Sequence, residues 1–198
     1  MLELGAGLGI VGAVIARHAR PAAQMAFEAN PGLIPHIAAL YALNRLKTRI
    51  TLRNQVLLSS PDRPDHVDFH LRNSFLGSSL IADDRRQTRA VQIATAGFDA
   101  LRESFAPTVL VMDIEGGELD FLEHADLSGL RAIVIEFHPD AYGMAGMRRC
   151  KQILRTAGFA KLDGPRPAPS GPAPARSEME HIPFDKRPPN PATAGPAT

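Results

Sequence analysis

The sequence predicts a doubly wound α/β domain, in which a mostly parallel sheet carries helices on both faces. Strand patterns alternate with segments of helical apolar spacing from residue 2 to residue 162. Two of the strand patterns, 108–113 and 132–137, are continuous apolar runs, which are typical of parallel strands buried on both faces. Three alternate glycines follow the first strand pattern and lead directly into a helical pattern, as at the ligand-binding edge of such sheets.

The individual elements are predicted from the period of the apolar residues and from turn and capping residues. Strands are expected at residues 2–4, 24–28, 50–58, 66–72, around 91–93, and at 108–113, 132–137 and 159–162. Helices are expected at residues 9–18, from the Asn30-Pro31 cap or from Pro35 to about 43, and at 98–105, 119–124 and 144–157. Residues 73–79 are expected to form a polar loop.

Composition and charge place the chain among globular proteins. Of 198 residues, 44% are hydrophobic and 22% are charged, which suits one domain with a substantial core. The net charge of +1 gives no general attraction to nucleic acid or to anionic membranes. The single cysteine excludes a disulfide framework, and neither a signal peptide nor a membrane span is recognisable. We therefore expect a cytoplasmic protein.

The composition changes after Asp163. More than half of the 17 prolines lie beyond this residue, together with few large apolar side chains. We expect a folded domain over residues 1–163 and a mostly disordered, proline-rich tail over residues 164–198. At the other end, the first strand pattern begins at Leu2, so the sequence predicts a domain without the lead-in that usually precedes such a strand.

The glycine-rich segment fits two cofactor patterns. Gly7, Gly9 and Gly12 match GxGxxG, which is typical of a loop that binds the pyrophosphate of a dinucleotide. Glu3, Gly5, Gly7 and Gly9 match acidic-x-Gly-x-Gly-x-Gly, which resembles the first motif of S-adenosylmethionine-dependent methyltransferases. A tight turn without a ligand would also use glycines here.

Glu28 ends the second predicted strand, 28 − 9 = 19 residues after Gly9. At that separation an acidic side chain can accept hydrogen bonds from both hydroxyls of a ribose, although a solvated loop glutamate is the simpler alternative. An acidic residue here also favours an unphosphorylated ribose. It does not separate S-adenosylmethionine from NAD.

A second group of polar residues follows the two buried strands. Asp113 and Glu115 end the first of them, where buried carboxylates need partners, and Glu118 in the next helical turn can complement the helix dipole. Glu136 and His138 end the second strand and share one side of it. His138 has the intrinsic pKa of a general base, but it could equally be bonded to backbone. Such a cluster could hold a divalent ion, yet no metal-ligand spacing is decisive, so no metal ligand is assigned.

Taken as a set, these segments resemble the FkbM-type methyltransferases in order and spacing. The resemblance covers roughly residues 2–159 and is carried by residues 3–9 (Glu-Leu-Gly-Ala-Gly-Leu-Gly), 27–31, 73–80, 112–119 and 135–139. It implies a Rossmann-like class I methyltransferase fold and S-adenosylmethionine as cofactor. The implied reaction is methylation, commonly of hydroxyls on sugars, glycans or natural products. The terminal hairpin of that fold is not recognisable before the proline-rich tail.

Under this interpretation the candidate residues divide into two groups. The cofactor would contact Glu3, Gly5, Gly7, Gly9, Glu28 and Asn30. The acceptor, or its departing proton, would contact Asp113, Glu115, Glu136 and His138. The expected partner is a small-molecule or glycan acceptor and not nucleic acid, and the sequence specifies neither that acceptor nor an oligomeric state.

Two other functions compete with this interpretation. The Gly7-Gly9-Gly12 spacing also suits an NAD-linked oxidoreductase. The missing lead-in and hairpin suit a truncated, non-catalytic remnant.

Overall fold

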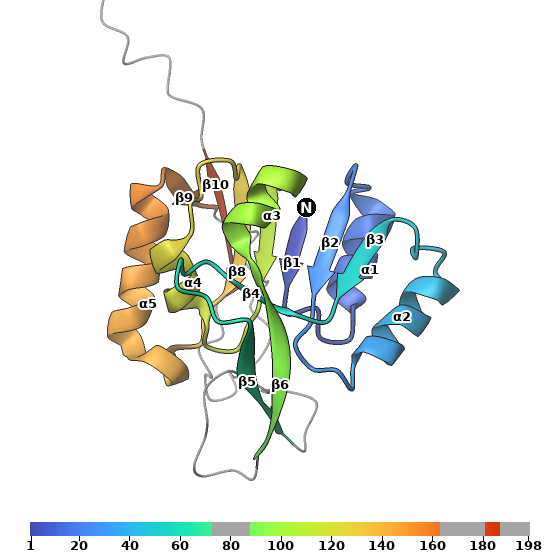
Figure 1. The fold of residues 1–198 in the computed structure, drawn as a ribbon. Helices are drawn as coiled ribbons and strands as arrows, with labels where there is room; N and C mark the ends of the chain where they lie inside the picture. The colour runs from blue at the N-terminus through green and yellow to red at the C-terminus, as the bar shows by residue number, and fades with distance from the viewer. Residues whose placement is uncertain (73–87, 163–180, 187–198) are drawn as a thin grey trace, which may run out of the picture.

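A seven-stranded sheet is the centre of the computed structural model, which describes residues 1–72, 88–162 and 181–186 (Figure 1). The strands follow the order β3-β2-β1-β7-β8-β10-β9. Their bounds are β1 Leu2–Leu4, β2 Gln24–Phe27, β3 Ile50–Arg53, β7 Val109–Met112, β8 Ala132–Glu136, β9 Phe159–Lys161 and β10 His181–Lys186. The pairs from β3 across to β8 are parallel, whereas β10 is antiparallel to both of its neighbours. The predicted doubly wound α/β sheet is confirmed.

The helices flank this sheet in two groups. Their bounds are α1 Ile10–His18, α2 Ile34–Leu43, α3 Phe98–Phe105, α4 Glu118–His124 and α5 Pro139–Thr156. In Figure 1, α1 and α2 lie beside β1, β2 and β3, while α4 and α5 lie beside the opposite half of the sheet. The main core lies under that second half, where Leu110, Ile133 and Ile135 are fully buried.

The start of one helix decides between two alternatives of the sequence prediction, and the start of another differs from it. The second helix begins at Ile34 with Pro35 in its first turn, which agrees with the predicted start near Pro35 and not with the one at the Asn30-Pro31 cap. The last helix was expected to begin at residue 144, but α5 already begins at Pro139 and is interrupted at Gly143, whose φ is 72°. A proline favours the first helical position, and the apolar period alone does not reveal such an added turn.

The segment predicted as one strand, 50–58, is two strands that belong to different sheets. β3 ends at Arg53, and β4 (Val56–Leu58) pairs instead with β6. Asn54 lies at the break, where its side-chain amide donates hydrogen bonds to the carbonyl oxygens of Glu28 (2.8 Å) and Ala29 (3.0 Å). The Asn54 side chain thus takes the place of a strand at the two carbonyl groups that follow β2. The chain turns away from the main sheet at this residue.

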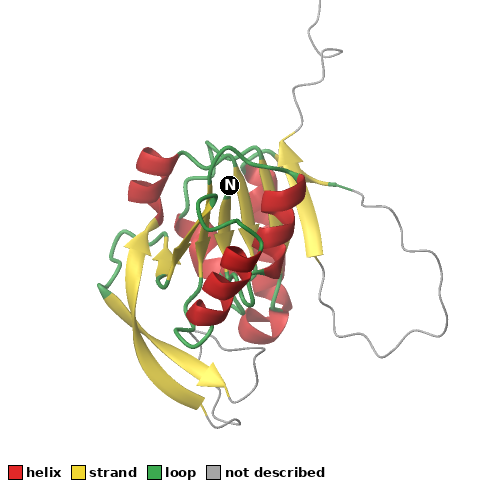
Figure 2. Ribbon diagram, turned by 90° about the vertical axis from the view of Figure 1, so that its right-hand side faces the viewer, coloured by secondary structure: helices red, strands yellow, loops and turns green. Residues whose placement is uncertain are grey.

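A long hairpin projects from the body of the domain (Figure 2). It consists of β5 (His66–Arg72) and β6 (Thr88–Gly97), which pair antiparallel along the whole length of β5 and form a second sheet with β4. Phe69 and Ile93 from the hairpin pack with Val56 of β4 in a small core of their own. The loop predicted at residues 73–79 lies outside the described residues.

The strand β10 corrects two expectations about the end of the chain. It is an ordered segment within residues 164–198, which were expected to form a mostly disordered tail, and with β9 it forms the terminal pair of strands that was not recognisable from the sequence. Phe184 is buried in the main core, and the carbonyl of Pro183 accepts a hydrogen bond from Leu162 N–H (2.8 Å). The surrounding prolines hid the short apolar alternation of this strand, because proline is rare inside sheets.

Replacing Phe184 by alanine should therefore lower the free energy of unfolding by about 3–5 kcal/mol, the usual cost of removing a buried phenylalanine. Urea denaturation of the full chain measures this value. The matched control is Asp185→Ala on the same strand, whose side chain is only partly buried, and a change below about 1 kcal/mol is expected there. Equal stability of the parent and Phe184→Ala proteins would show that β10 contributes nothing to the domain.

Candidate active site

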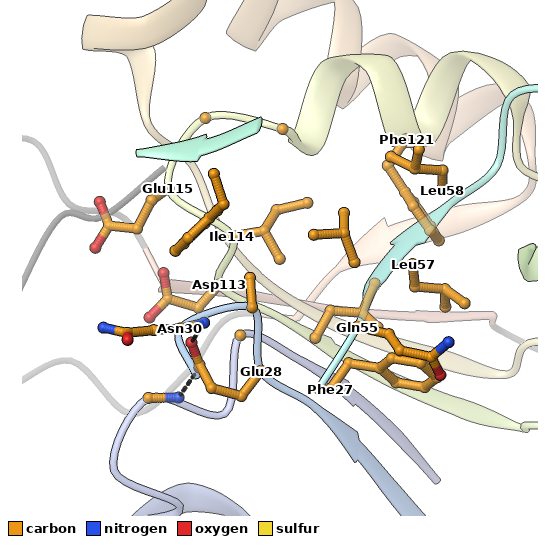
Figure 3. Close-up of a pocket in the computed structure, with 18 of the residues that line it drawn as sticks. Phe27, Glu28, Asn30, Gln55, Leu57, Leu58, Asp113, Ile114, Glu115 and Phe121 are labelled. Atoms are coloured by element: carbon orange, nitrogen blue, oxygen red, sulfur yellow. Dashed lines mark hydrogen bonds between the residues drawn. The ribbon is translucent and has the colours of Figure 1, made fainter. Parts of the chain in front are cut away.

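One cavity of about 400 Å³ opens at the carboxyl ends of the central strands, the edge at which parallel α/β sheets bind ligands. Its wall combines the glycine loop after β1, the end of β2, strand β4 and the turn between β7 and α4. Figure 3 shows that the cavity has two unlike ends. Asn30, Asp113 and Glu115 lie toward one end, and Leu57, Leu58 and Phe121 lie toward the other.

The glycine loop reaches the cavity through two of its glycines. Gly5 and Gly7 line the cavity and have φ angles of 78° and 56°, a region that residues with a Cβ rarely adopt. The N–H groups of Gly5 and Ala6 both donate to the carbonyl oxygen of Phe27 at 3.0 Å, which fastens the loop to β2. A Cβ atom on Gly5 would overlap the carbonyl oxygen of Asp113. Gly5 therefore allows the loop to cross directly over the end of β7.

The other two glycines of the segment serve packing inside the domain. A Cβ atom on Gly9 would lie 2.7 Å from Ile37 in α2, and one on Gly12 would overlap the carboxylate of Glu3. Neither residue belongs to the cavity wall that the described residues form. Two of the three glycines in the dinucleotide pattern thus have a structural reason that involves no ligand.

Glu3, expected near the cofactor, points into the interior behind the loop. It is only 2% exposed and lies against Gly12, Gln24 and Tyr41. Burial raises the pKa of its carboxyl group from 4.5 to about 7, against the opposing effect of hydrogen bonds to Gly12 and Gln24. The structure places Glu3 outside the cavity wall.

This buried carboxyl group should make stability depend on pH. Because the pKa of Glu3 is higher in the folded state, its contribution is complete below pH 4.5 and is lost as pH rises through 7. Between pH 5 and pH 8 the parent should lose on the order of 2–3 kcal/mol more stability than Glu3→Gln, which has no charge to bury. Urea denaturation of both proteins at the two pH values measures this difference. Parallel pH profiles would mean that Glu3 ionises normally.

Glu28 ties the glycine loop to the end of β2. Its two carboxylate oxygens accept hydrogen bonds from Gly7 N–H (2.7 Å) and Asn30 N–H (2.8 Å), as Figure 3 shows beside the polar end of the cavity. Burial raises the pKa of this carboxyl group although both hydrogen bonds favour the charged form. The backbone of Ala29 also contributes a hydrogen bond that favours the charged form. The two carboxylate oxygens have four lone pairs together, so at least one position remains for a further donor. The Asn30 side chain accepts a hydrogen bond from Gly32 N–H (2.9 Å) and so stabilises the following turn.

The four residues expected to contact the acceptor lie together, with three carboxylates around the imidazole ring of His138. Nε2 of His138 lies 3.6 Å from Asp113 Oδ1, 3.5 Å from Glu115 Oε2 and 4.0 Å from Glu136 Oε1. Asp113 and Glu115 line the cavity, whereas Glu136 and His138 are not among the described residues that line it. Parallel strand ends bring these residues together, as their sequence positions predicted.

Glu118 is the member of this cluster whose role the sequence did not indicate. It was expected only to complement the dipole of α4, but its side chain is fully buried. Its Oε1 lies 2.8 Å from His138 Nδ1 and accepts a hydrogen bond from Gly116 N–H (3.1 Å). The ring of His138 is thus bonded to a carboxylate and not to backbone. A glutamate in a first helical turn gives no sequence signal for such burial.

The surroundings of His138 also change its expected chemistry. Burial by itself would lower the pKa of the imidazole, but the hydrogen bond to Glu118 and the charges of Glu118, Glu115 and Asp113 raise it to about 9. A pKa of about 9 favours the doubly protonated ring at neutral pH. A histidine base that ionises near 6.5 does not fit this arrangement.

The sequence also missed the apolar wall of the cavity. This wall consists of β4 residues Val56, Leu57 and Leu58, together with Phe69 from the hairpin and Phe121 from α4. The available signal was Asn54, a turn-forming residue inside an otherwise continuous strand pattern.

Comparison with known proteins agrees with the fold and the motifs. The strand order, with one antiparallel strand inserted before the edge, is that of a class I methyltransferase. The model of the methyltransferase FkbM domain matches residues 7–161, and the chain belongs to this family.

Solved structures give a more distant likeness. A Streptococcus pneumoniae protein described as a candidate tRNA (m1A22) methyltransferase superposes with a TM-score of 0.51 at 14% identity, over 93% of this chain and 62% of its own. A candidate methyltransferase of Thermoplasma acidophilum gives 0.43 at 10% identity, over 92% and 64% of the two chains. The [4+2]-cyclase SpnF gives 0.40 at 16% identity, over 82% and 51%. The chain spans less than two thirds of the length of each of these structures.

No curated protein matches the chain. Among the helices of the described residues, none is long and apolar enough to cross a membrane.

Proposed function

We propose that this protein is an S-adenosylmethionine-dependent O-methyltransferase that acts on a hydroxyl group of a sugar, glycan or natural product. One observation carries the proposal. A single cavity is lined both by the glycine loop with Glu28 and by the carboxylates Asp113 and Glu115. Cofactor and acceptor can therefore meet in one space.

We place the cofactor in the cavity in the following orientation. The ribose hydroxyls would donate to the carboxylate of Glu28, and the methionine part would lie over Gly5 and Gly7. The adenine would then lie toward the apolar wall near Leu57, where a planar ring loses contact with water. This orientation directs the sulfonium methyl group toward Asp113.

The transfer itself requires alignment and the removal of one proton. Bound S-adenosylmethionine would supply an activated methyl group and would leave as the neutral thioether, while the cavity wall would align the acceptor oxygen with that methyl group. The hydroxyl proton goes to a carboxylate of the cavity wall, Asp113 or Glu115. His138 is outside the cavity wall that the described residues form and holds both carboxylates in place with its ring nitrogen.

The competing functions have less support. Gly9 and Gly12 both pack against other side chains, but Gly9 is shared with the S-adenosylmethionine pattern, so only Gly12 weighs against a dinucleotide. A truncated remnant is less attractive because β9 and β10 supply the terminal strands. We place the catalytic domain at residues 1–162 together with β10, and the cytoplasm remains the location expected from the sequence.

Thermal melting with added ligands tests the proposal. A ligand that binds only the folded state raises the melting midpoint. At a hundredfold excess over its Kd, such a ligand adds about 2.7 kcal/mol to the free energy of unfolding. For a chain of this size that corresponds to roughly 5–10 °C. We expect this rise with S-adenosylhomocysteine and none with NADH. A rise with NADH alone would identify the oxidoreductase, and no rise with either would favour a protein without a cofactor.

A further inference from the structure

We propose that Asp113, Glu136 and His138 bind a divalent transition-metal ion beside the cavity. The three residues come from the end of β7, the end of β8 and the residue before α5. Each offers one ligand atom, and these atoms lie within 4.8 Å of one another. Binding of the ion can be tested on its own, whereas the catalytic role given to it below rests on the proposed methyl transfer.

The distances suit shared coordination. Nε2 of His138 lies 3.6 Å from Asp113 Oδ1 and 4.0 Å from Glu136 Oε1. Two ligands that are each about 2.1 Å from one ion lie about 3 Å apart when adjacent and about 4.2 Å apart when opposite. The third pair, Asp113 and Glu136, lies within 4.8 Å, so the side chains must move closer together to share one ion.

Glu118 supplies an independent observation. Metal-binding histidines generally donate their second ring N–H to a carboxylate, which fixes the tautomer and the orientation of the ring. Glu118 is fully buried and lies 2.8 Å from Nδ1 of His138. Its second oxygen is also buried. The side chain is thus positioned entirely inside the protein to orient this ring.

The orientation of the ring has a chemical consequence. With Nδ1–H directed at Glu118, Nε2 faces carboxylate oxygens of Asp113, Glu115 and Glu136. A bare nitrogen lone pair would be repelled by three acceptors, so a proton or a metal ion must lie at Nε2. A position built for a cation between an imidazole and carboxylates suits Mn²⁺, Co²⁺ or Zn²⁺ better than Mg²⁺, which prefers oxygen ligands alone.

The ion would deepen the proposed reaction in one respect. Asp113 lines the cavity, so an open coordination position on its side is accessible to the acceptor hydroxyl. The ion would make a hydroxyl at that position more acidic, and Glu115, which is outside the ligand set, could accept its proton. The deprotonated oxygen would then be the nucleophile of the proposed methyl transfer.

Titration of the full chain with Mn²⁺ alone, followed by the electron paramagnetic resonance signal of the free ion, tests the site. We expect one tight site per chain. Asp113→Asn and Glu136→Gln should each weaken binding at least about a hundredfold, and Glu118→Gln by about 10–100-fold. The matched control is Asp120→Asn, which removes a carboxylate from the cavity wall outside the ligand set and should leave Mn²⁺ affinity unchanged.

The melting midpoint of every variant without metal shows whether it is folded, and the rise of the parent midpoint with Mn²⁺ gives a second readout that needs no variant. Absence of both signals in the parent at millimolar Mn²⁺ would overturn the proposal and leave a proton at Nε2. An equal loss of affinity in Asp120→Asn would also overturn it, because general negative charge would then explain binding. Neither assay contains S-adenosylmethionine, so its outcome is independent of whether the cofactor proposal holds.

Discussion

Replacing Gly5 by alanine should lower the free energy of unfolding by about 3 kcal/mol or more. The new Cβ would overlap the backbone carbonyl of Asp113, and the residue would also have to keep a φ of 78°. Backbone cannot rotate away as a side chain can, so either the loop or the end of β7 must move. Urea denaturation measures the loss, and binding of S-adenosylhomocysteine should disappear with it.

Gly7→Ala is the matched control for this effect. Gly7 lies two residues further in the same loop with a φ of 56°, but its Cβ would have no heavy atom of the described residues within 4 Å. Only the cost of the left-handed conformation applies, about 1 kcal/mol. Equal losses in the two variants would mean that the contact between the loop and Asp113 is not as close as described.

Replacing Glu28 by alanine should weaken binding of S-adenosylhomocysteine by about 2–3 kcal/mol, which corresponds to roughly 30–150-fold in Kd. The substitution removes both acceptors that the ribose would use. It also leaves Gly7 N–H and Asn30 N–H without their carboxylate, so the melting midpoint should fall as well.

Calorimetry well below both melting midpoints separates the effect of Glu28→Ala on affinity from its effect on stability. Asp120→Asn serves as a control, since Asp120 lines the same cavity and has no place in the proposed cofactor contacts. An unchanged Kd in Glu28→Ala would remove this residue from the cofactor site and leave it only the task of fastening the loop.

The sequence predicted the central sheet well because its signals are local. Apolar runs such as 109–112 identify buried parallel strands, and the glycines after β1 identify a sharp turn. Local signals do not show why each position requires glycine. No larger residue fits at Gly9 or Gly12, because Ile37 and Glu3 lie against these positions in the folded protein. These contacts form only after folding, so the sequence does not reveal them.

The candidate site was predicted in position but not in chemistry. The ends of β7 and β8 were expected to meet, and Asp113, Glu115 and His138 do lie together. The ionisation of His138 could not be predicted, because it depends on Glu118, whose burial follows from the packing of α4. In the same way, β10 was missed because long-range pairing outweighs the poor strand preference of a proline-containing segment.

A crystal structure of the protein with bound S-adenosylhomocysteine tests the central claim most directly. The account predicts that both ribose hydroxyls lie within hydrogen-bond distance of the Glu28 carboxylate, with the homocysteine part over Gly5 and Gly7 and the sulfur atom on the side of Asp113. The ligand bound in another part of the molecule, or in this cavity with its ribose away from Glu28, would contradict the account.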